Sequence, residues 1–362
     1  MRYLTDKSKG AVYLQLYESL REDIVKGIYA YGEKLPSKRN LAENCRVSTV
    51  TVEHAYALLS DEGYVEPRER SGYIVIFRQD DGFALSTHTV PSLKREEHRE
   101  GDFPTFPGSV FSKTVRRVLT ERESVLDTKA EGLGTPELRE AIRRYLARNR
   151  GISVAADEIV IGAGSEYLYR LIIELLGRDK LYAIESPSYN KIEEVYRTAE
   201  VRCELLPLTE TGIESSALAA SSADVLHTTP YRSYPSGVTA TATKRHEYLR
   251  WASERERYII EDDFESEFSL SAKPTETLFA LSERENVIYL NTFSKTISPS
   301  LRIGYMVLPR PLARLFKEKL GFYSSTVPTF MQLILAELIE GGDFERHINR
   351  VRRKKRKEES ER

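Results

Sequence analysis

The sequence is poor in the residues that build disulfide or zinc frameworks, with 2 cysteines, Cys45 and Cys203, and 6 histidines among 362 residues. This scarcity argues against a disulfide-stapled secreted domain and against a cysteine-based zinc cluster, so we expect no metal site. The opening residues, MRYLTDKSKG, lack the apolar core of a signal peptide, and no apolar run is long enough to cross a bilayer. We therefore expect a cytoplasmic protein without a membrane partner.

A large excess of charge of either sign is also absent, because 54 basic residues face 55 acidic ones. Binding to nucleic acid would therefore have to come from a local patch and not from the overall charge. The length favours two or three domains, and a hydrophobic fraction of 40% is ample for a buried core.

The strongest chemical signal lies between Tyr258 and Tyr305. Two short apolar runs, at 258–260 and 287–290, are typical of buried β-strands, and polar groups follow each of them. In open α/β sheets, ligands bind beyond the carboxyl ends of parallel strands. Asp262 and Lys295 are therefore expected to face one crevice.

Pyridoxal 5'-phosphate needs this set of groups. A lysine forms an internal aldimine with its aldehyde, a carboxylate keeps the pyridine nitrogen protonated, and hydroxyls with a cation hold the phosphate. We assign Lys295 to the aldimine and Asp262 to the pyridine nitrogen. Thr292, Ser294 and Arg302 are then the predicted phosphate ligands.

Residues 1–78 have the pattern of a DNA-binding domain that begins with an amphipathic helix ending near Gly27. Ser37 and Ser48 are placed to cap two further short helices, at about 38–44 and 49–60. Two capped helices joined by a tight turn predict a helix-turn-helix, whose second helix can enter the major groove. An ordinary helical hairpin with exposed charges remains the alternative.

A β-wing is predicted after the second of these helices. The segment GYVEPRERSGYIVIF reads as a strand, a turn that carries Arg68, Arg70 and Gly72, and a second strand. Hydrophobic periodicity then disappears in 79–104, which we interpret as a flexible linker. Residues 105–362 form the predicted second domain.

A second phosphate-binding element is expected early in this domain. A strand at 158–161 is followed by GAGSEYLYRL, a glycine turn that opens a helix. Backbone amides at a helix start, together with the hydroxyl of Ser165 beside Gly164, are suited to an anion.

These motifs resemble known families. EDDFESEF and TFSKTISPSLRIGY resemble the core of fold type I aminotransferases, in the form carried by the MocR branch of GntR-type transcription regulators. LPSKRNLA, VSTVTVEHAY and EGYVEPRERSGY resemble the winged-helix domain of the same regulators. The resemblance implies an α/β chain with a winged helix-turn-helix followed by an aminotransferase-like large domain, whose mainly parallel sheet is flanked by helices. It also implies a homodimer.

The resemblance assigns further site residues. Ser37 and Arg39 would hold DNA phosphates, Thr49 and Thr51 would approach bases or backbone, and Arg70 with Gly72 would reach the flanking groove. In the second domain it implies cofactor contacts from the following residues: Gly164, Ser165, Glu166, Tyr189, Arg232 and Phe264.

The chain departs from the family pattern at several of these positions. A basic residue is usual at Thr49, Gln at Glu166, His at Arg232 and Tyr at Phe264. The C-terminal small domain, which supplies an arginine for substrate carboxylates in the family, is expected to be largely missing.

Three functions fit these observations. The leading one is a regulator that binds double-stranded DNA and senses pyridoxal phosphate, or an amino acid or amine effector, through Lys295. An aminotransferase with an attached DNA-binding domain is the second, although little or no turnover is expected without the small domain. A regulator that has lost its cofactor is the third.

Overall fold

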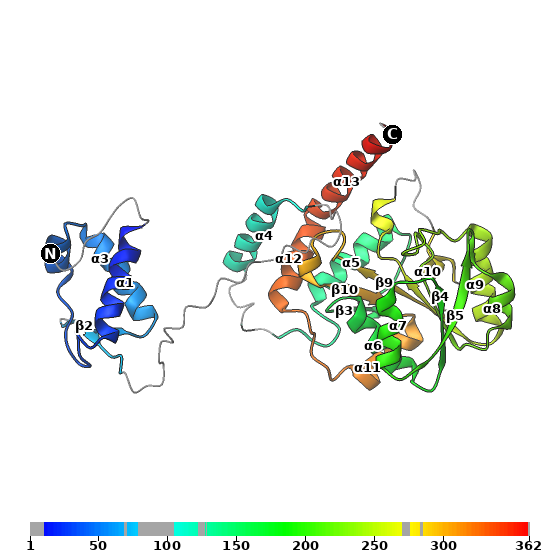
Figure 1. Cartoon of the computed structure of the whole chain (residues 1–362), viewed down its shortest axis with the longest axis horizontal. Helices are drawn as coiled ribbons and strands as arrows, with labels where there is room; N and C mark the ends of the chain where they lie inside the picture. Colours follow the sequence, from blue (N-terminus) through cyan, green and yellow to red (C-terminus); the bar gives the residue numbers. More distant parts are fainter. Residues whose placement is uncertain are drawn as a thin grey trace. The chain divides into compact units, whose positions relative to one another are not determined.

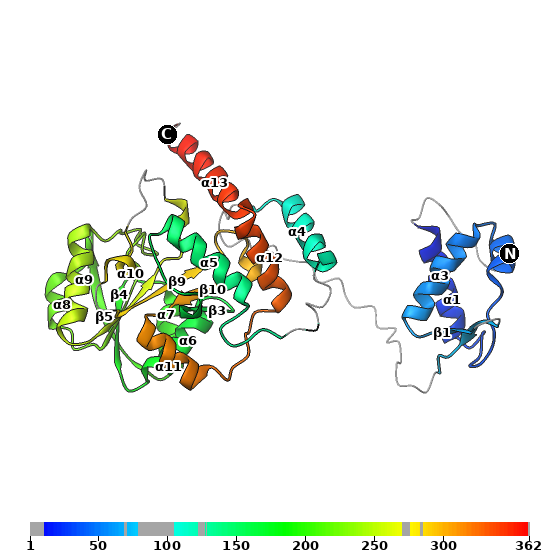
Figure 2. The same cartoon turned by 180° about the vertical axis from the view of Figure 1, so that it is seen from behind.

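The computed structural model describes residues 11–68, 71–78, 105–121, 127, 129–269, 276–282 and 285–360. The chain forms two compact units, one within residues 1–97 and the other within 98–362, and each is described by itself (Figures 1 and 2). The predicted linker, 79–104, and Arg70 lie outside the described residues.

Three helices and a two-stranded sheet make up the first unit. They are α1 (Val12–Val25), α2 (Lys38–Cys45), α3 (Thr49–Asp61), β1 (Val65–Arg68) and β2 (Gly72–Val75). Ser37 accepts a hydrogen bond from the Asn40 amide at 3.2 Å, and Ser48 accepts one from the Thr51 amide at 3.1 Å. Both predicted caps are thus confirmed, because each hydroxyl satisfies an amide that has no partner within its helix.

The wing is an antiparallel pair in which Arg68 lies opposite Gly72. Arg68 begins the predicted turn, because the Ser71 amide donates to its carbonyl at 3.0 Å, but the expectation that Gly72 lies in the turn was wrong, since Gly72 is the first residue of β2. Tyr56 of α3 is fully buried, donates to the carbonyl of Pro36 at 2.7 Å, and meets the Tyr73 ring edge-on. This contact joins the helix-turn-helix to the wing in one core.

The second unit is built on an eight-stranded sheet in the order β3-β10-β9-β8-β7-β4-β5-β6. The strands are β3 (Ile159–Gly162), β4 (Leu181–Ser186), β5 (Arg202–Thr209), β6 (Gly212–Ile213), β7 (Val225–Thr228), β8 (Tyr258–Asp262), β9 (Val287–Thr292) and β10 (Gly304–Val307). Neighbours from β9 to β5 are parallel, whereas β10 is antiparallel to β3 and β9, and β6 is antiparallel to β5. The predicted mainly parallel sheet is confirmed.

Helices cover both faces of this sheet (Figures 1 and 2). Alternate strand residues point to opposite faces, so Ile288 and Leu290 pack with α6 (Ser165–Leu176), α7 (Asn190–Thr198) and α11 (Arg310–Leu320). The other face carries α5 (Pro136–Asn149), α12 (Thr329–Glu340), α8 (Ser215–Ala220) and α9 (Ala242–Glu254). The remaining helices are α4 (Gly108–Glu121), α10 (Leu278–Leu281) and α13 (Asp343–Ser360).

The described helices include none that combines the length and the apolar composition of a membrane span. Among the same residues, no group of three or more His, Cys, Asp or Glu side chains is placed to hold a metal ion.

Candidate functional site

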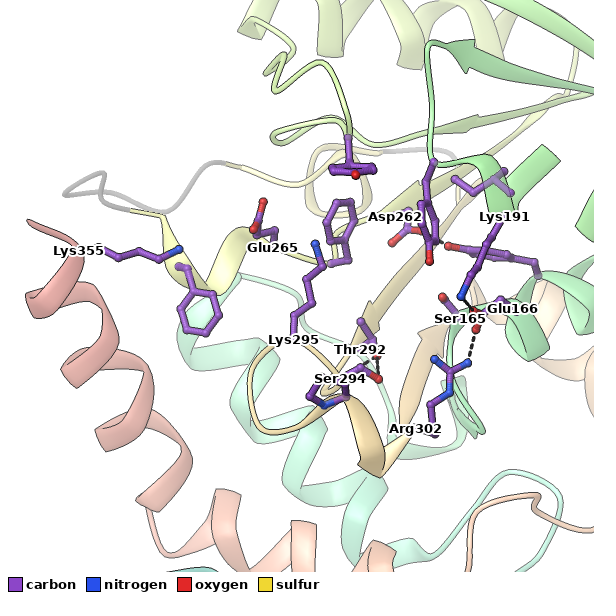
Figure 3. Close-up of a pocket in the computed structure, with 17 residues that line it drawn as sticks. Ser165, Glu166, Lys191, Asp262, Glu265, Thr292, Ser294, Lys295, Arg302 and Lys355 are labelled. Atoms are coloured by element: carbon purple, nitrogen blue, oxygen red, sulfur yellow. Dashed lines mark hydrogen bonds and ion pairs between the residues drawn. The ribbon is translucent and has the colours of Figure 1, made fainter. Parts of the chain in front are cut away.

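A cavity of about 690 Å³ lies where β8 and β9 end. Residues from distant parts of the second unit line it, as Figure 3 shows. Among the predicted residues these are Ser165, Glu166, Tyr189, Asp262, Phe264, Thr292, Ser294, Lys295 and Arg302. The parallel pairing of β8 with β9 brings Asp262 opposite Leu290, and this register places the acid and the lysine loop at one sheet edge.

Lys295 extends into this cavity from the loop after β9 (Figure 3). Its Nζ lies 4.2 Å from the centroid of the Phe264 ring, so an apolar surface covers one side of the amine. Burial lowers the pKa of Lys295, and the acids Glu265 and Asp262 oppose that shift only in part. A larger share of neutral amine, the form that attacks an aldehyde, is the chemical consequence.

Asp262 is the last residue of β8 and is only 4% exposed. The hydroxyl of Tyr169 donates a hydrogen bond to its Oδ2, and Nε2 of His227 lies 3.7 Å from the same atom. The other ring nitrogen of His227 pairs with the Tyr196 hydroxyl at 2.7 Å. These neighbours hold the carboxylate in a fixed orientation at the cavity wall.

The opposite end of the cavity is rich in anion-binding groups. Gly164 precedes the amino end of α6 with a φ of +89°, and a side chain there would come within 2.8 Å of Arg302 Nη2. The Thr292 hydroxyl accepts from the Ser294 amide at 3.2 Å, which fixes the loop that carries both hydroxyls. Ser165, at the start of α6, also lines this end.

A carboxylate already occupies part of this anion-binding end. Glu166 is ion-paired with Arg302, and Lys191 Nζ lies 3.4 Å from Glu166 Oε1 (Figure 3). Burial alone would raise the pKa of Glu166, but hydrogen bonds from its own backbone amide and from Arg302 outweigh burial and lower it. The acid at position 166 is therefore paired with Arg302, which the sequence predicts to be a phosphate ligand.

Two predicted cofactor residues, Gly164 and Arg232, are not part of the cavity lining, and Arg232 lies on a different loop. The Arg232 side chain is about half exposed, and its Nε lies 3.9 Å from Glu265 Oε2. Tyr234 of the same loop does line the cavity and meets the Tyr189 ring edge-on, with centroids 6.1 Å apart.

Sequence reasoning missed several lining or supporting residues, namely Tyr169, Lys191, His227, Tyr234 and Lys355. For two of these residues, the sequence contained a signal that could have identified them. Tyr169 stands four residues after Ser165 and hence on the same face of α6, and His227 is a polar residue within the apolar run of β7. Nothing in the sequence places Lys355 of α13 at this site.

The predicted DNA-contacting residues of the first unit are mostly exposed. Arg39 lies on α2, and Ser48 and Thr49 lie at the amino end of α3. Thr51 is half-buried, and its hydroxyl is 2.8 Å from that of Ser48. Arg68 is exposed but is paired with Glu66 at 3.2 Å, which partly neutralises it.

Comparisons with known proteins agree with both units. A profile described as bacterial regulatory proteins, gntR family, matches residues 12–75, and one described as aminotransferase class I and II matches residues 114–362. YdeL, an uncharacterized HTH-type transcriptional regulator of Bacillus subtilis strain 168, is 33% identical over 356 residues, covering 96% of this chain and 77% of that protein. The chain belongs to the MocR-type branch of the GntR regulators.

Two further relatives of this regulator are informative. The HTH-type pyridoxine biosynthesis transcriptional regulator PdxR of Corynebacterium glutamicum is 29% identical, over 94% of this chain and 75% of that protein. Kynurenine aminotransferase of Pyrococcus horikoshii, solved in complex with PMP, is 26% identical with a TM-score of 0.62. That alignment covers 70% of this chain and 66% of the enzyme, slightly less than two thirds of its length.

The second unit of the regulator has groups that fit pyridoxal phosphate. The cavity combines an amine of lowered pKa, a buried carboxylate, and a cradle of small residues and hydroxyls next to Arg302. In addition, Nε2 of His227 is buried beside Asp262 with no hydrogen-bond partner among the described residues. A protonated pyridine nitrogen that pairs with Asp262 would add a positive charge next to the Asp262 carboxylate and the His227 ring.

Proposed function

We propose that this regulator binds DNA through its first unit and pyridoxal phosphate through its second, and that cofactor or effector binding changes its action on DNA in the cytoplasm. One observation carries the proposal: Asp262, Lys295 and Arg302 line the same cavity although they come from separate segments. The volume of this cavity is typical of small-molecule sites.

Each residue at the cavity has a defined role in this proposal. When bound, pyridoxal phosphate supplies an aldehyde, which condenses with an amine with loss of water, and an electron-withdrawing ring. Lys295 would provide the amine, and the Asp262 carboxylate would accept a hydrogen bond from the protonated ring nitrogen, while Tyr169 holds that carboxylate in position. Arg302, Ser165, Thr292 and Ser294, which line the cavity, would hold the phosphate.

The DNA contacts are proposed for residues of the helix-turn-helix and the wing. Ser37, the cap of α2, and Arg39 on α2 would hold phosphates, while Ser48, Thr49 and Thr51 approach the major groove with the start of α3. Arg68, Arg70 and Gly72 of the wing would contact the flanking groove. Since operators are commonly read as paired half-sites, we propose a homodimer.

Occupancy of the cavity can control DNA binding only if the ligand binds two conformations of the dimer with different affinity. An amino acid or amine that displaces Lys295 from the aldehyde is the effector class that this site favours. Because PdxR is named for pyridoxine biosynthesis, compounds related to this vitamin are the first effectors to test.

Catalysis of transamination is the second candidate, because the likeness to kynurenine aminotransferase extends to the domain that holds the site. Imine chemistry at Lys295 serves both functions, but turnover also needs a positioned amino acid substrate. Sustained production of a keto acid from any amino acid would favour the enzyme, whereas amine exchange without turnover would favour the sensor.

Absorbance tests the cofactor site. Protein mixed with pyridoxal phosphate should develop a band above about 400 nm, which is the signature of the lysine-bound aldehyde. Lys295→Ala should abolish it. Lys355→Ala is the matched control, because this lysine faces the same cavity but lies 4.9 Å from the Phe268 ring, and it should retain the band. A band that survives Lys295→Ala would reject the assignment.

A gel shift on the upstream region of the protein's own gene tests the DNA contacts. Arg39→Ala should weaken binding and reduce the salt dependence by the equivalent of about one phosphate contact. Lys26→Ala is the control, because Lys26 is already paired with Glu22 at 2.7 Å. Equal binding by Arg39→Ala, Arg70→Ala and the unmodified protein would exclude these residues as contacts.

A further inference from the structure

The phosphate end of the cavity contains an acid that the proposed ligand does not need. Glu166 is the second residue of α6, at the helix end where backbone amides and the helix dipole attract anions. Its carboxylate is paired with Arg302, the cation on which phosphate recognition depends (Figure 3). A phosphate group and this carboxylate would therefore compete for the same donors.

The contacts of Glu166 match those of a bound anion. One oxygen pairs with Arg302, the other lies 3.4 Å from Lys191 Nζ, and the backbone amide of Glu166 donates to its own carboxylate. Because these contacts lower the pKa of Glu166, the group stays ionised at neutral pH. Its side chain is 24% exposed, so solvent does not fully screen it.

The structure also offers the displaced carboxylate an alternative partner. Lys191 lies at the amino end of α7, beside Tyr189, whose hydrogen bond raises the pKa of Lys191. When a phosphate enters, Glu166 can therefore lose its ion pair with Arg302 and retain the one with Lys191. A carboxylate without a second cation would have to remain unpaired next to the phosphate, which costs more.

Building on the proposed function, we propose that Glu166 is an internal competitor of the phosphate group and sets the affinity of this site for phosphorylated ligands. Glutamine at this position would leave Arg302 available and would remove a negative charge from the phosphate site. Glu166 thus makes cofactor loading weaker and reversible, as a sensor that responds to ligand concentration requires.

Affinities for paired ligands test the proposal. Glu166→Gln should bind pyridoxal phosphate on the order of threefold to tenfold more tightly than the unmodified protein, given the strength of partly exposed ion pairs. Pyridoxal, which has the aldehyde but no phosphate, should bind both proteins equally. The absorbance band above about 400 nm reports both titrations. Glu174→Gln is the control for charge, since Glu174 lies on the same helix about 12 Å further along.

Inorganic phosphate separates this inference from the function on which it rests. Calorimetry should show tighter phosphate binding to Glu166→Gln even if no ligand reacts with Lys295. An absent band together with this difference would reject the proposed function and retain the competitor role. Circular dichroism checks that Glu166→Gln and Glu166→Ala are folded. If both folded variants bind phosphate as weakly as the unmodified protein, or more weakly, Glu166 is not a competitor. Equal tightening of pyridoxal binding would also overturn the proposal.

Discussion

The two units of this regulator build their candidate sites in different ways. In the first unit the residues are close in sequence, mostly exposed, and positioned by local caps such as Ser48 on Thr51. In the second unit, residues as far apart as Ser165 and Arg302 meet around a cavity and rely on buried partners. The first site depends on local backbone geometry, and the second depends on the packing of the whole sheet.

This difference predicts how each site responds to substitution. An exposed contact can be changed with little effect on folding, because water replaces the lost partner. A buried polar group is costly when its partner is removed, because no water compensates. Substitutions in the second unit should therefore combine effects on ligand binding and on stability, unless they lie on the cavity side of the strand.

The largest effects are expected at two neighbouring acids, Asp262 at the end of β8 and Asp263 directly after it. Asp263 pairs with the buried Arg150 and accepts from Tyr289 at 2.7 Å, whereas Asp262 faces the cavity. Asp263→Asn should lower the free energy of unfolding by about 3–5 kcal/mol, because it leaves Arg150 buried and uncompensated. Asp262→Asn should instead weaken pyridoxal phosphate binding about 10- to 100-fold, since it removes a charge-assisted hydrogen bond.

Denaturant unfolding and absorbance titration, applied to both variants, measure these two effects. Equal loss of stability in the two variants would show that Asp262 is a structural residue and not a cofactor ligand. Unchanged stability of Asp263→Asn would remove the distinction between a structural role for Asp263 and a ligand-binding role for Asp262.

An intermediate effect is expected at Glu185, a buried acid on β4. Burial raises its pKa to about 7, and hydrogen bonds from Ser233 and Thr228 oppose this shift only in part. The folded state therefore holds a proton that the unfolded state has released, and stability should fall as pH rises from about 4.5 to about 7. Glu185→Gln should reduce this fall by about 1–3 kcal/mol.

Melting temperatures between pH 5 and pH 8 test this expectation. Part of the decline should remain in Glu185→Gln, because burial also raises the pKa of Glu261, to about 8. Identical pH profiles for the two proteins would show that Glu185 does not titrate in this range.

The smallest effect is expected at the cap of α3. Ser48→Ala should destabilise the first unit by about 1 kcal/mol, because the Thr51 amide loses its acceptor. Ser48→Asp restores a good cap but adds a negative charge near DNA phosphates, so it should keep the stability and weaken DNA binding. Unfolding curves and gel shifts measure these quantities separately. If both variants lose stability equally, the local cap is not what holds this helix.

Much of the fold was predictable because local signals were strong. The predicted helix at 38–44 is α2 (Lys38–Cys45), and the runs at 258–260 and 287–290 are β8 and β9. The strand expected at 158–161 begins one residue later, because Glu158 ends a short helical turn and accepts from the Ala155 amide at 2.9 Å. β10 was not foreseen, since the residues before it read as a phosphate loop and its short run gives no direction of pairing.

The candidate site was predictable where motifs follow strand ends, as at Asp262 and Lys295. It was not predictable where a contact joins elements far apart in the chain. The hydroxyl of Tyr169 reaches Asp262 across 93 positions, and Arg302 reaches Glu166 across 136. Periodicity in a single segment contains no information about such pairs.

The sequence by itself determined the local structure, the two-unit organisation and the residue types available for chemistry, because caps, strand runs and motif spacing depend on near neighbours. Only the tertiary structure decided which buried groups meet around Asp262. It also decided that Glu166 forms an ion pair with Arg302. The physical reason is that these contacts form only once the register of the sheet and the docking of α6 have brought distant side chains within hydrogen-bonding distance.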